Sequence, residues 1–488
     1  MALEDIKNAR LAKLRELRKA GIDPYPAVSH RTISVAEALE RFDTLADSNE
    51  EVILSGRIMA KREHGGSAFF DINDGGTKIQ AFIKEDVVGA EQFKQFQDFF
   101  DIGDFIEVAG TLFKTKKEER TVEVKHFMML TKSLLPLPEK WHGLQDTEER
   151  FRKRYLDLIF NEDVRKKFQM RFKTLDLVRE FFRERGYMEV ETPVLQSMPG
   201  GATARPFKTH LNALDMDLYL RVAPELYLKR LLVGGFDKVF EIAKNFRNEG
   251  MDREHNPEFD MLEAYAAYQN YEDYMNMAED LLVFLVRQLF DSDEIHYGGH
   301  EISVQKPFKR IEFNQVIMDA CGLDYDQASE DDFRAKAKEL GVVIEKTMSK
   351  GVIADEIYKK VARPNMINPT FVINHPLELS PLTKKLPDNP EHVARFQLLI
   401  GGFELMNAFS ELNDPQDQLE RFQGQEKLRK KGDEEAQRLD EDFIEALEYG
   451  MPPAAGIGIG LDRLIALLTD SHSLREILLF PTMRNKEK

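Results

Sequence analysis

The chain has 488 residues and a formal net charge of −18, and 42% of its residues are hydrophobic while 32% are charged. These values are typical of a folded protein of two or three domains, and the charge argues against nonspecific binding to a polyanion. A single cysteine excludes an internal disulfide framework and a cysteine-based zinc site, and no apolar run approaches a membrane span, so we expect a cytoplasmic protein without membrane contact.

The first 50 residues are predicted to form a basic helix and a lead-in to the next domain. Within residues 4–20, Leu11, Leu14 and Leu17 recur at helical spacing, and the sequence GIDPYP at 21–26 ends the helix. The helix is basic although the chain is acidic, because it carries Lys7, Arg10, Lys13 and Arg18. Two interpretations stay open: a solvated helix face, or a strip of cations that contacts nucleic-acid phosphates.

Residues 51–135 are predicted to form a small barrel of the oligonucleotide-binding (OB) type. The segment contains several short β-rich runs separated by Gly-Gly pairs and basic loops, which is the pattern of successive hairpins. On such barrels, aromatic side chains on one face stack on single-stranded bases. The expected nucleic-acid contacts are Arg62, Phe69 and Gln80, with Lys61 beside them. The alternative for Phe69 or Phe70 is that the ring fills the barrel interior.

A linker and a larger domain are predicted to follow the barrel. Residues 136–160 contain Pro136 and Pro138 and read as a stiff linker that runs into a helix. Residues 161–488 alternate helical and strand patterns to the end of the chain. Within them, residues 270–385 are more helical, acidic and irregular, as an insertion would be.

The sequence FRNEGMDREHNPEF, residues 246–259, is predicted to be the charged loop of a long antiparallel hairpin, because alternating runs flank it. The second strand would present four residues on one face: Phe259, Met261, Glu263 and Tyr265. Burying Arg247, Glu249 and Glu263 costs free energy unless a ligand or partner neutralises their charges. The alternative is a set of mutual salt bridges on an exposed face.

Two further stretches are weak signals when each is taken alone. AAGIGIGLDRL, residues 454–464, reads as a glycine-rich strand followed by a helix. It would place Arg463 at the helix N-terminus, where backbone N–H groups already favour an anion. GYMEVETPVLQ, residues 186–196, follows a helical pattern and reads as a short strand next to Pro193.

In this order, the stretches at 186–196, 246–259 and 454–464 resemble motifs 1, 2 and 3 of the class II aminoacyl-tRNA synthetases. An N-terminal OB barrel narrows the resemblance to the aspartyl, asparaginyl and lysyl branch. Three more stretches resemble the lysyl-tRNA synthetases in particular: GGATARPF (200–207), RVAPELYLKRLLVGGFDKVFEI (221–242) and FELMNAFSELNDP (403–415).

The resemblance covers nearly the whole chain and implies a fold and an activity. The fold is α+β, with the OB barrel preceding a class II catalytic domain built on an antiparallel sheet with flanking helices. The activity is the ATP-dependent formation of lysyl-adenylate and transfer of L-lysine to tRNA(Lys). A homodimer would form through the motif 1 helix and strand at 174–196.

By this resemblance, motifs 2 and 3 bind ATP and supply the catalytic residues Arg247 and Arg463. Arg247 would bridge the lysine carboxylate and the α-phosphate, and Arg463 would cover the adenine and meet the γ-phosphate. The other expected ATP contacts are Glu249 at the adenine amino group, Phe259 at the adenine face, His255 with Arg253 at the outer phosphates, Asn256 and Glu404.

Mg²⁺ is the expected cofactor, with Glu404 and Gln397 at the places where the family has two acidic residues. Gln397 departs from that pattern, so the number and affinity of the ions stay open. Glu254 is a second departure, because it stands directly before His255 where the family often has arginine. Arg253 lies one position earlier.

The resemblance also implies a pocket with carboxylates for both ammonium groups of lysine. Glu225 and Glu411 would face the side-chain ammonium, and Glu263 would take the α-ammonium. The full set of expected lysine contacts is Gly201, Glu225, Arg247, Glu263, Tyr265, Asn407, Phe409 and Glu411. A pocket for aspartate would need cations at the side-chain end instead.

Two alternatives belong to other classes of protein. A paralogue that attaches lysine to a translation factor would resemble the catalytic domain alone and lack the barrel. A non-catalytic binding protein on the same fold would have lost charges from motif 2 or motif 3. The barrel pattern and the presence of Arg247 and Arg463 favour the enzyme.

Overall fold

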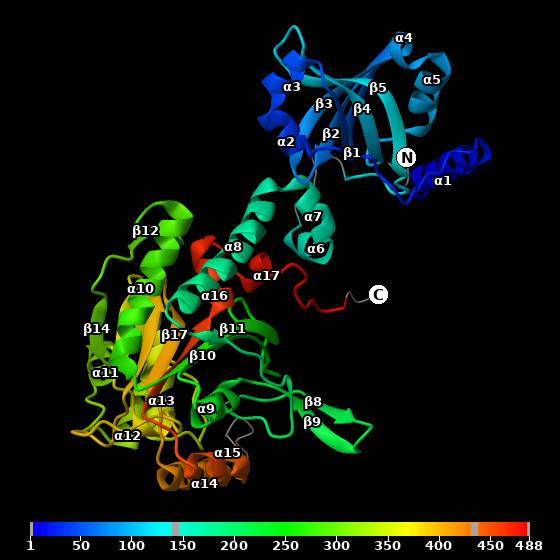
Figure 1. Ribbon diagram of the computed structural model, residues 1–488. Coiled ribbons are helices and arrows are strands. Elements are labelled where there is room, and N and C mark those ends of the chain that lie inside the picture. The colour runs from blue at the N-terminus through cyan, green and yellow to red at the C-terminus, as the bar shows by residue number, and fades with distance from the viewer. Residues whose placement is uncertain (1–2, 139–145, 203, 431–437, 486–488) are drawn as a thin grey trace. The chain divides into compact units, whose positions relative to one another are not determined.

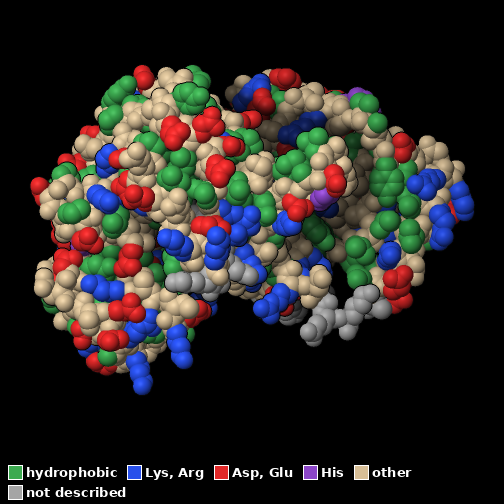
Figure 2. Space-filling model, turned by 90° about the horizontal axis from the view of Figure 1, so that it is seen from below, with side chains coloured by type: hydrophobic (Ala, Val, Ile, Leu, Met, Phe, Trp, Pro, Cys, Tyr) green, Lys and Arg blue, Asp and Glu red, His purple; other side chains and the backbone are tan. Residues whose placement is uncertain are grey.

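The computed structural model describes residues 3–138, 146–202, 204–430 and 438–485. The chain divides into two units, Met1–Glu162 and Asp163–Lys488. Part of the segment predicted as a linker, 139–145, lies outside the described residues. Acidic, basic and apolar side chains are interspersed over the face shown in Figure 2, as is common for a solvated surface.

The N-terminal unit is built on a closed five-stranded barrel with strand order β1-β2-β3-β5-β4, which confirms the predicted OB barrel (Figure 1). The strands are β1 (Glu51–His64), β2 (Ser67–Asp74), β3 (Thr77–Lys84), β4 (Phe105–Lys114) and β5 (Arg120–Thr131). Burial alternates along β1, so Val52 and Leu54 point into the core. Phe70 is also buried in the core, whereas Phe69 is only half-buried.

Helices pack around this barrel. They are α1 (Leu3–Lys19), α2 (Val35–Glu40), α3 (Phe42–Ser48), α4 (Glu85–Val88) and α5 (Ala90–Phe99). Two further helices, α6 (Thr147–Arg152) and α7 (Arg154–Phe160), follow the barrel in the chain and pack against each other. Helices α6 and α7 occupy most of the described part of the predicted linker. A buried carboxylate explains why they form, because Asp157 accepts hydrogen bonds from Arg150 at 2.8 Å and Arg154 at 2.6 Å.

The basic N-terminal helix uses two of its cations to pack on the barrel. Arg10 is buried, and its guanidinium donates to Ser133 Oγ at 2.6 Å and to the carbonyl oxygen of Ile102 at 2.9 Å. Lys13 forms an ion pair with Asp101 at 2.7 Å. Arg10 and Lys13 are therefore structural, which corrects the interpretation of these two residues as phosphate contacts.

The second unit is built on an eight-stranded sheet with strand order β14-β15-β16-β17-β18-β11-β10-β6. The strands are β6 (Met188–Glu189), β10 (Lys238–Phe246), β11 (Glu258–Ala267), β14 (Lys309–Glu312), β15 (Thr370–Ile373), β16 (Arg395–Ile400), β17 (Phe403–Ser410) and β18 (Ala454–Gly460). The predicted antiparallel sheet is confirmed from β15 to β10. Parallel pairs occur at the two edges, β14 with β15 and β6 with β10.

One face of this sheet packs against three helices: α8 (Glu162–Glu184), α10 (Tyr271–Phe290) and α16 (Leu461–Leu468). Figure 1 shows these helices beside the sheet. Leu262 and Ala264 of β11 belong to the shared core. Because side chains alternate along a strand, Glu263 and Tyr265 point to the opposite face.

The segment 270–385 is more than the helical insertion that was predicted. Its helix α10 covers the sheet, and its strands β14 and β15 extend the sheet by two positions. A separate small core forms around α11 (Phe313–Cys321), α12 (Glu330–Glu339), α13 (Lys350–Ile357) and the short helices η1 (Tyr358–Ala362) and η2 (Arg363–Asn365).

Smaller elements complete the unit. They are the three-stranded sheet of β7 (Leu195–Gln196), β9 (Met216–Leu220) and β8 (Lys208–Leu211), the hairpin of β12 (Glu294–Tyr297) and β13 (His300–Ser303), and the helices α9 (Glu225–Val233), η3 (Leu377–Leu379), α14 (Pro415–Lys430), α15 (Glu441–Glu448) and α17 (Leu474–Ile477). In the described part of the chain, no helix has the length and apolar character of a membrane span.

Candidate active site

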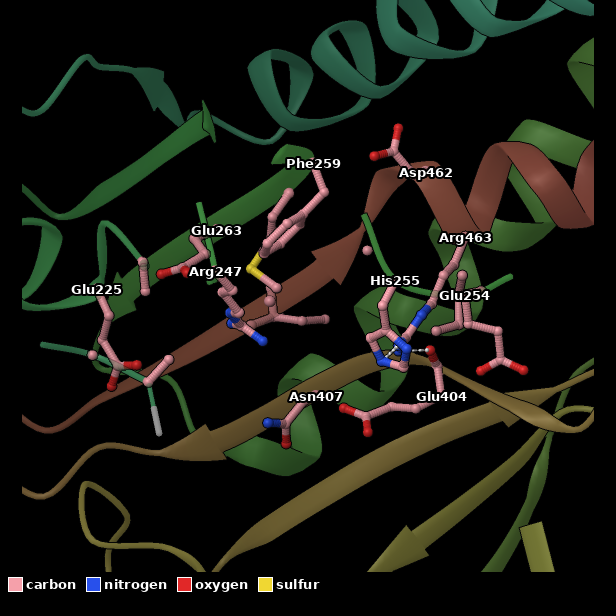
Figure 3. A pocket seen from close by; sticks show the side chains of 18 of the residues that line it. Glu225, Arg247, Glu254, His255, Phe259, Glu263, Glu404, Asn407, Asp462 and Arg463 are labelled. Carbon is pink, nitrogen blue, oxygen red and sulfur yellow. Dashed lines mark hydrogen bonds between the residues drawn. The ribbon is translucent and has the colours of Figure 1, made fainter. Parts of the chain in front are cut away.

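A cavity of about 710 Å³ lies over the neighbouring strands β11, β17 and β18. The predicted face of β11 lines it with Phe259, Met261, Glu263 and Tyr265. Figure 3 shows that the cavity has two ends, with Glu225 at one and His255, Arg463 and Glu404 at the other. The charged hairpin therefore lines a cavity and is not an exposed sheet face.

Arg247 lies between these ends, directly after β10 (Figure 3). Its Nε is buried and has no hydrogen-bond partner among the described residues. Burial lowers the pKa of this guanidinium from its ordinary value, against the opposing effect of Glu249 and Glu263. The guanidinium carbon also lies 5.0 Å from the centre of the Phe259 ring. An anionic ligand would satisfy the unpaired N–H group.

The second end is organised by Arg463, the third residue of α16. Its Nη1 donates to the carbonyl oxygen of Glu404 at 2.9 Å, and its Nη2 lies 3.2 Å from His255 Nε2. His255 Nδ1 in turn lies 2.9 Å from the Asp252 carboxylate. These contacts suit a neutral imidazole that donates from Nδ1 and accepts at Nε2.

An ionic network holds the start of α16 in place. Arg171 of α8 donates to Asp462 Oδ1 at 2.7 Å and also pairs with Asp260 of β11. Asp462 Oδ2 accepts from the backbone N–H of Asp260 at 3.0 Å. Arg463 is therefore attached to a helix end that is fixed to both α8 and β11.

Glu404 lines the cavity and is held by Gln397. The Gln397 amide nitrogen donates to Glu404 Oε2 at 3.1 Å, and its oxygen accepts from the Tyr358 hydroxyl at 3.0 Å. Gln397 is buried, and in this arrangement its amide nitrogen orients Glu404. That Gln397 is a metal ligand stays a prediction. Within the described ranges, no group of three or more His, Cys, Asp or Glu is placed to hold a metal.

The opposite end of the cavity is acidic. Glu225, the first residue of α9, lines it together with Glu263, Tyr265, Asn407 and Phe409. The Tyr265 hydroxyl donates to Glu263 Oε2 at 2.9 Å. Burial, together with the nearby Glu225, raises the pKa of Glu263 to about 8. A cationic ligand would favour the ionised form of these carboxyl groups.

Two glycines make room at this acidic end. Gly201 has φ +87°, and a Cβ added there would lie 2.8 Å from Glu225 Cβ. A Cβ added at Gly456 would lie 2.3 Å from Glu411 Oε1 and from a Tyr265 ring carbon. Larger residues at these positions would displace the side chains that shape the cavity.

Glu411 lies behind the acidic end, since it is fully buried and is not one of the described residues that line the cavity. Its Oε2 is 2.5 Å from Lys229 Nζ, and Glu225 Oε1 is 2.6 Å from the same ammonium. Burial raises the pKa of Glu411 to about 8, with Lys229 opposing the shift. The sequence analysis missed Lys229, although its i,i+4 spacing from Glu225 is the signal for such a pair.

Three more cations that the sequence analysis missed also line the cavity: Lys359, Arg363 and Arg395. The side chain of Arg363 is only 14% exposed, and it forms a long ion pair with Glu254 at 3.6 Å. Arg395 donates to Asn407 Oδ1 at 2.9 Å. Nothing in the local sequence around these three residues distinguishes them from surface cations.

The remaining predicted residues of the ATP end occupy different places. Glu249 lines the cavity, and its Oε1 accepts from the backbone N–H of Arg205 at 3.3 Å. Asn256 also lines it and donates to the carbonyl oxygen of Glu258 at 2.6 Å. Arg253 is exposed and is not among the described residues that line the cavity.

The N-terminal unit carries a separate candidate surface on the outside of the barrel. The rings of Phe69 and Phe82 stack with centroids 4.3 Å apart and planes inclined by 17°. Phe113 lies 6.3 Å from Phe82, and all three rings are half-buried. Phe69 is therefore available to a ligand, whereas Phe70 fills the barrel as the alternative predicted.

The polar residues predicted beside Phe69 differ in their contacts. Arg62 is exposed. Gln80 is half-buried, and its Oε1 accepts from the Thr121 hydroxyl at 3.1 Å, which leaves its amide N–H₂ to donate. Lys61 donates to the carbonyl oxygen of Phe96 at 3.1 Å, at the end of α5. Lys61 is thus a helix cap, which corrects its interpretation as a surface contact.

The main cavity has the chemistry to join two anions. Its centre holds a buried arginine, one end holds cations and an aromatic ring, and the other end holds carboxylates. Such an arrangement can hold a nucleoside triphosphate and a cationic carboxylic acid with their reacting groups on Arg247.

Comparisons with known proteins agree with this geometry. The family model for class II tRNA synthetases (D, K and N) matches residues 146–484, and the model for the OB-fold nucleic acid binding domain matches residues 52–130. A curated protein of Carboxydothermus hydrogenoformans named lysine--tRNA ligase is 51% identical, with 99% of each chain covered. Proteins of the same name from Pelotomaculum thermopropionicum and Halalkalibacterium halodurans are 48% and 46% identical, with 99% and 100% of this chain and 96% and 98% of theirs covered.

Proposed function

We propose, from the premise that this chain belongs to the class II tRNA synthetases (D, K and N), that it is a lysine–tRNA ligase. The main support for lysine as the amino acid substrate is the acidic end of the cavity, which is lined by Glu225 and Glu263. Carboxylates suit the two ammonium groups of lysine, whereas an aspartate side chain would be repelled. The names of the curated relatives support the same choice.

The first step joins the lysine carboxylate to the α-phosphate of ATP and releases pyrophosphate. Arg247 would donate to both anions, which reduces their repulsion and aligns the carboxylate oxygen with phosphorus. Its unpaired Nε supports this role. The carboxylate is already ionised, so the step needs no general base from the protein. The lysine is then transferred to the 3′ end of tRNA(Lys).

The ATP would occupy the end that holds Arg463 and His255. Phe259 offers a face for the adenine ring, and Glu249 would accept from the adenine amino group. Arg463 and His255 would contact the outer phosphates, to which their present contacts already direct them. Negative charge that develops on the leaving pyrophosphate is thereby stabilised in advance.

Mg²⁺ fits this end of the cavity with one protein ligand. Glu404 lines the cavity and offers a carboxylate, which together with phosphate oxygens and water is a common set for this ion. When bound, Mg²⁺ would neutralise charge on the triphosphate. Gln397 would hold Glu404 in place through its amide group.

The barrel would bind the U-rich anticodon of tRNA(Lys). The stacked Phe69 and Phe82 provide an aromatic surface for an unpaired base, and Gln80 has an amide group free to donate to a base edge. Arg62 would contact a phosphate. We place this activity in the cytoplasm, where the chain would meet tRNA, ATP and lysine.

The active form would be a homodimer. Apolar residues along the motif 1 helix and strand are exposed: Phe172 at 49%, Met188 at 54%, Val194 at 39% and Leu195 at 48%. A partner subunit that covers them would remove this apolar surface from water. Light scattering at micromolar concentration should show a dimer, and a single monomeric species would contradict the proposal.

The function is tested by the exchange of labelled pyrophosphate into ATP. The exchange should require lysine and should not be supported by aspartate or asparagine, and the protein should charge tRNA(Lys). A folded Arg247→Ala variant should lose the exchange, by about 3 kcal/mol of transition-state stabilisation or more. Exchange with aspartate in place of lysine would overturn the assignment of the amino acid.

A further inference from the structure

A buried ion triad of Glu225, Lys229 and Glu411 lies at the acidic end of the cavity. One ammonium serves two carboxylates, at 2.6 Å from Glu225 Oε1 and 2.5 Å from Glu411 Oε2. The side chains of Lys229 and Glu411 are fully buried, while Glu225 lines the cavity. Lys229 therefore contacts both carboxylates from the side away from a ligand.

Packing leaves the ammonium of Lys229 little choice of partner. Lys229 follows Glu225 by one helical turn on α9, which brings the two side chains together. The rings of Phe409 and Phe443 lie 5.4 and 6.0 Å from its Nζ. On the other side, the absence of a Cβ at Gly456 lets Glu411 approach β18.

The triad has two negative charges and one positive charge when all three groups are ionised. Burial opposes the charge on Lys229, but Glu225 and Glu411 outweigh it and raise the pKa of the ammonium. Burial raises the pKa of Glu411 to about 8 in spite of Lys229. One buried cation is thus insufficient for two buried carboxylates, and a second ammonium would complete the set.

The other charged and titratable groups that face the triad do not supply this cation. On β11, Glu263 adds a negative charge when it is ionised, and Tyr265, whose pKa is raised, adds no charge. Arg395 of β16 acts on Glu225 through space, but its guanidinium donates to Asn407 Oδ1 at 2.9 Å and to Ser380 Oγ at 2.8 Å.

We infer that Lys229 is a positioning residue that cancels one of the two carboxylate charges, so that the fully ionised triad, which a bound ammonium favours, presents a single negative charge to the side-chain ammonium of the amino acid. This inference rests on the proposed function and deepens it. Specificity for lysine then depends on a lysine of the protein that does not touch the substrate. An uncharged amino acid of the same length would leave the triad one cation short.

The test changes the charge of the triad in two steps. Glu411→Gln makes the triad neutral, so the KM for lysine should rise at least about tenfold while the KM for ATP changes little. Adding Lys229→Met to that variant restores the single negative charge. The KM for lysine should then fall again by at least about threefold, although a second buried ion has been removed. Preference for lysine over norleucine should recover with it.

A lysine of the barrel provides the matched control. Lys132 is also fully buried and also contacts two carboxylates, those of Asp101 and Asp104. Lys132→Met should lower the melting temperature and leave the KM for lysine in pyrophosphate exchange unchanged. If the Glu411→Gln variants fail to fold, the KM for lysine is compared instead between Glu225→Gln alone and Glu225→Gln with Lys229→Met.

The outcomes separate this inference from the proposed function. If the unmodified protein shows no lysine-dependent exchange, the proposed function is wrong. If the unmodified protein is active but the double variant binds lysine no better than Glu411→Gln alone, Lys229 is only a structural ion. Should neither double variant fold, Lys229→Met alone decides: a KM for lysine with the same pH profile as the unmodified protein overturns the inference.

Discussion

Arg363 contributes a positive charge to the cavity from outside the three motifs. Its side chain is 14% exposed, and its ion pair with Glu254 is long, at 3.6 Å. A largely buried guanidinium with so weak a contact is costly unless a ligand completes its hydrogen bonds. Glu254 stands in the loop position where the resemblance implies that the family often has arginine. Arg363 therefore supplies a cation to the cavity that this loop position does not supply.

We predict that Arg363→Gln raises the KM for ATP in pyrophosphate exchange. The loss of a charge-assisted hydrogen bond to a phosphate should cost about 1.5–3 kcal/mol, and the KM for lysine should stay nearly constant. Lys360→Gln is the control, because Lys360 is a nearby cation whose ammonium donates to the Gly341 carbonyl and is not one of the described cavity residues. An unchanged KM for ATP would show that Arg363 does not contact the nucleotide.

Gln397 determines how much negative charge surrounds Glu404. We predict that Gln397→Glu increases the affinity for Mn²⁺ in the presence of ATP, because a second carboxylate joins the site. Without metal, the two carboxylates repel each other and the melting temperature should fall; Mg²⁺ with ATP should restore it. Calorimetric titration and thermal unfolding measure the two effects. A variant that binds Mn²⁺ no more tightly would contradict the placement of Gln397 beside the metal.

At the scale of elements, the pairing of the strands fixes the positions of the site residues that they bear. Strand β11 sends Leu262 and Ala264 into the core and Glu263 and Tyr265 into the cavity. A one-residue shift in its pairing would exchange these two sets, so burial of the apolar face fixes the positions of the charged one. The aromatic face of the barrel depends on the same alternation.

For the barrel, we predict that Phe69→Ala weakens the binding of tRNA(Lys) by about 1–3 kcal/mol, the usual contribution of one stacked base. Pyrophosphate exchange should not change, because adenylate formation takes place within the other unit. Phe70→Leu is the comparison: it should lower the melting temperature through lost core packing and affect tRNA binding much less. Normal affinity for tRNA in Phe69→Ala would remove Phe69 from the interface.

Elements that show a residue pattern within a short stretch of sequence could be predicted. The hairpin β10–β11, the glycine-rich strand β18 and the barrel strands alternate in a way that short windows reveal. The parallel edge strand β14 pairs with β15, some 60 residues further along the chain, and no local pattern announces that pairing.

Site residues divide in the same way. Arg247, Phe259 and Arg463 stand in recognisable motifs and line the cavity as predicted. Lys229 was missed because its second carboxylate, Glu411, is 182 positions away. For Arg10 and Lys13, a solvated face and a phosphate-contacting strip both stayed open, because the sequence does not show that Ser133 and Asp101 would pair with them.

At the scale of the whole molecule, stability and binding are linked through the acidic end of the cavity. Burial raises the pKa of both Glu263 and Glu411 from 4.5 to about 8. The folded protein therefore keeps protons that the unfolded chain would lose. Their contribution to stability is fully present below pH 4.5 and is lost as the pH rises through about 8.

We predict that the melting temperature of the second unit falls between pH 6 and about pH 8.5, and that saturating lysine reduces this fall because its ammonium groups stabilise the ionised carboxylates. Differential scanning calorimetry across this range, with and without lysine, measures both. Glu263→Gln should make the profile flatter. A melting temperature that rises with pH over this interval would contradict the raised pKa values.

The four cavity residues of β11 also make this strand a measure of length. Phe259, Met261, Glu263 and Tyr265 stand at fixed intervals of about 6.8 Å, the repeat of two residues in an antiparallel strand. From Phe259 to Tyr265 the strand spans about 20 Å, with the aromatic ring of Phe259 at one end and the acidic end of the cavity at the other. Because these positions are fixed, the length of a ligand decides whether its last atom reaches the residue at the far end of the strand. An amino acid one methylene shorter than lysine could occupy every earlier mark and still fall short of the last, so selectivity among diamino acids would be set by the backbone as much as by any side chain.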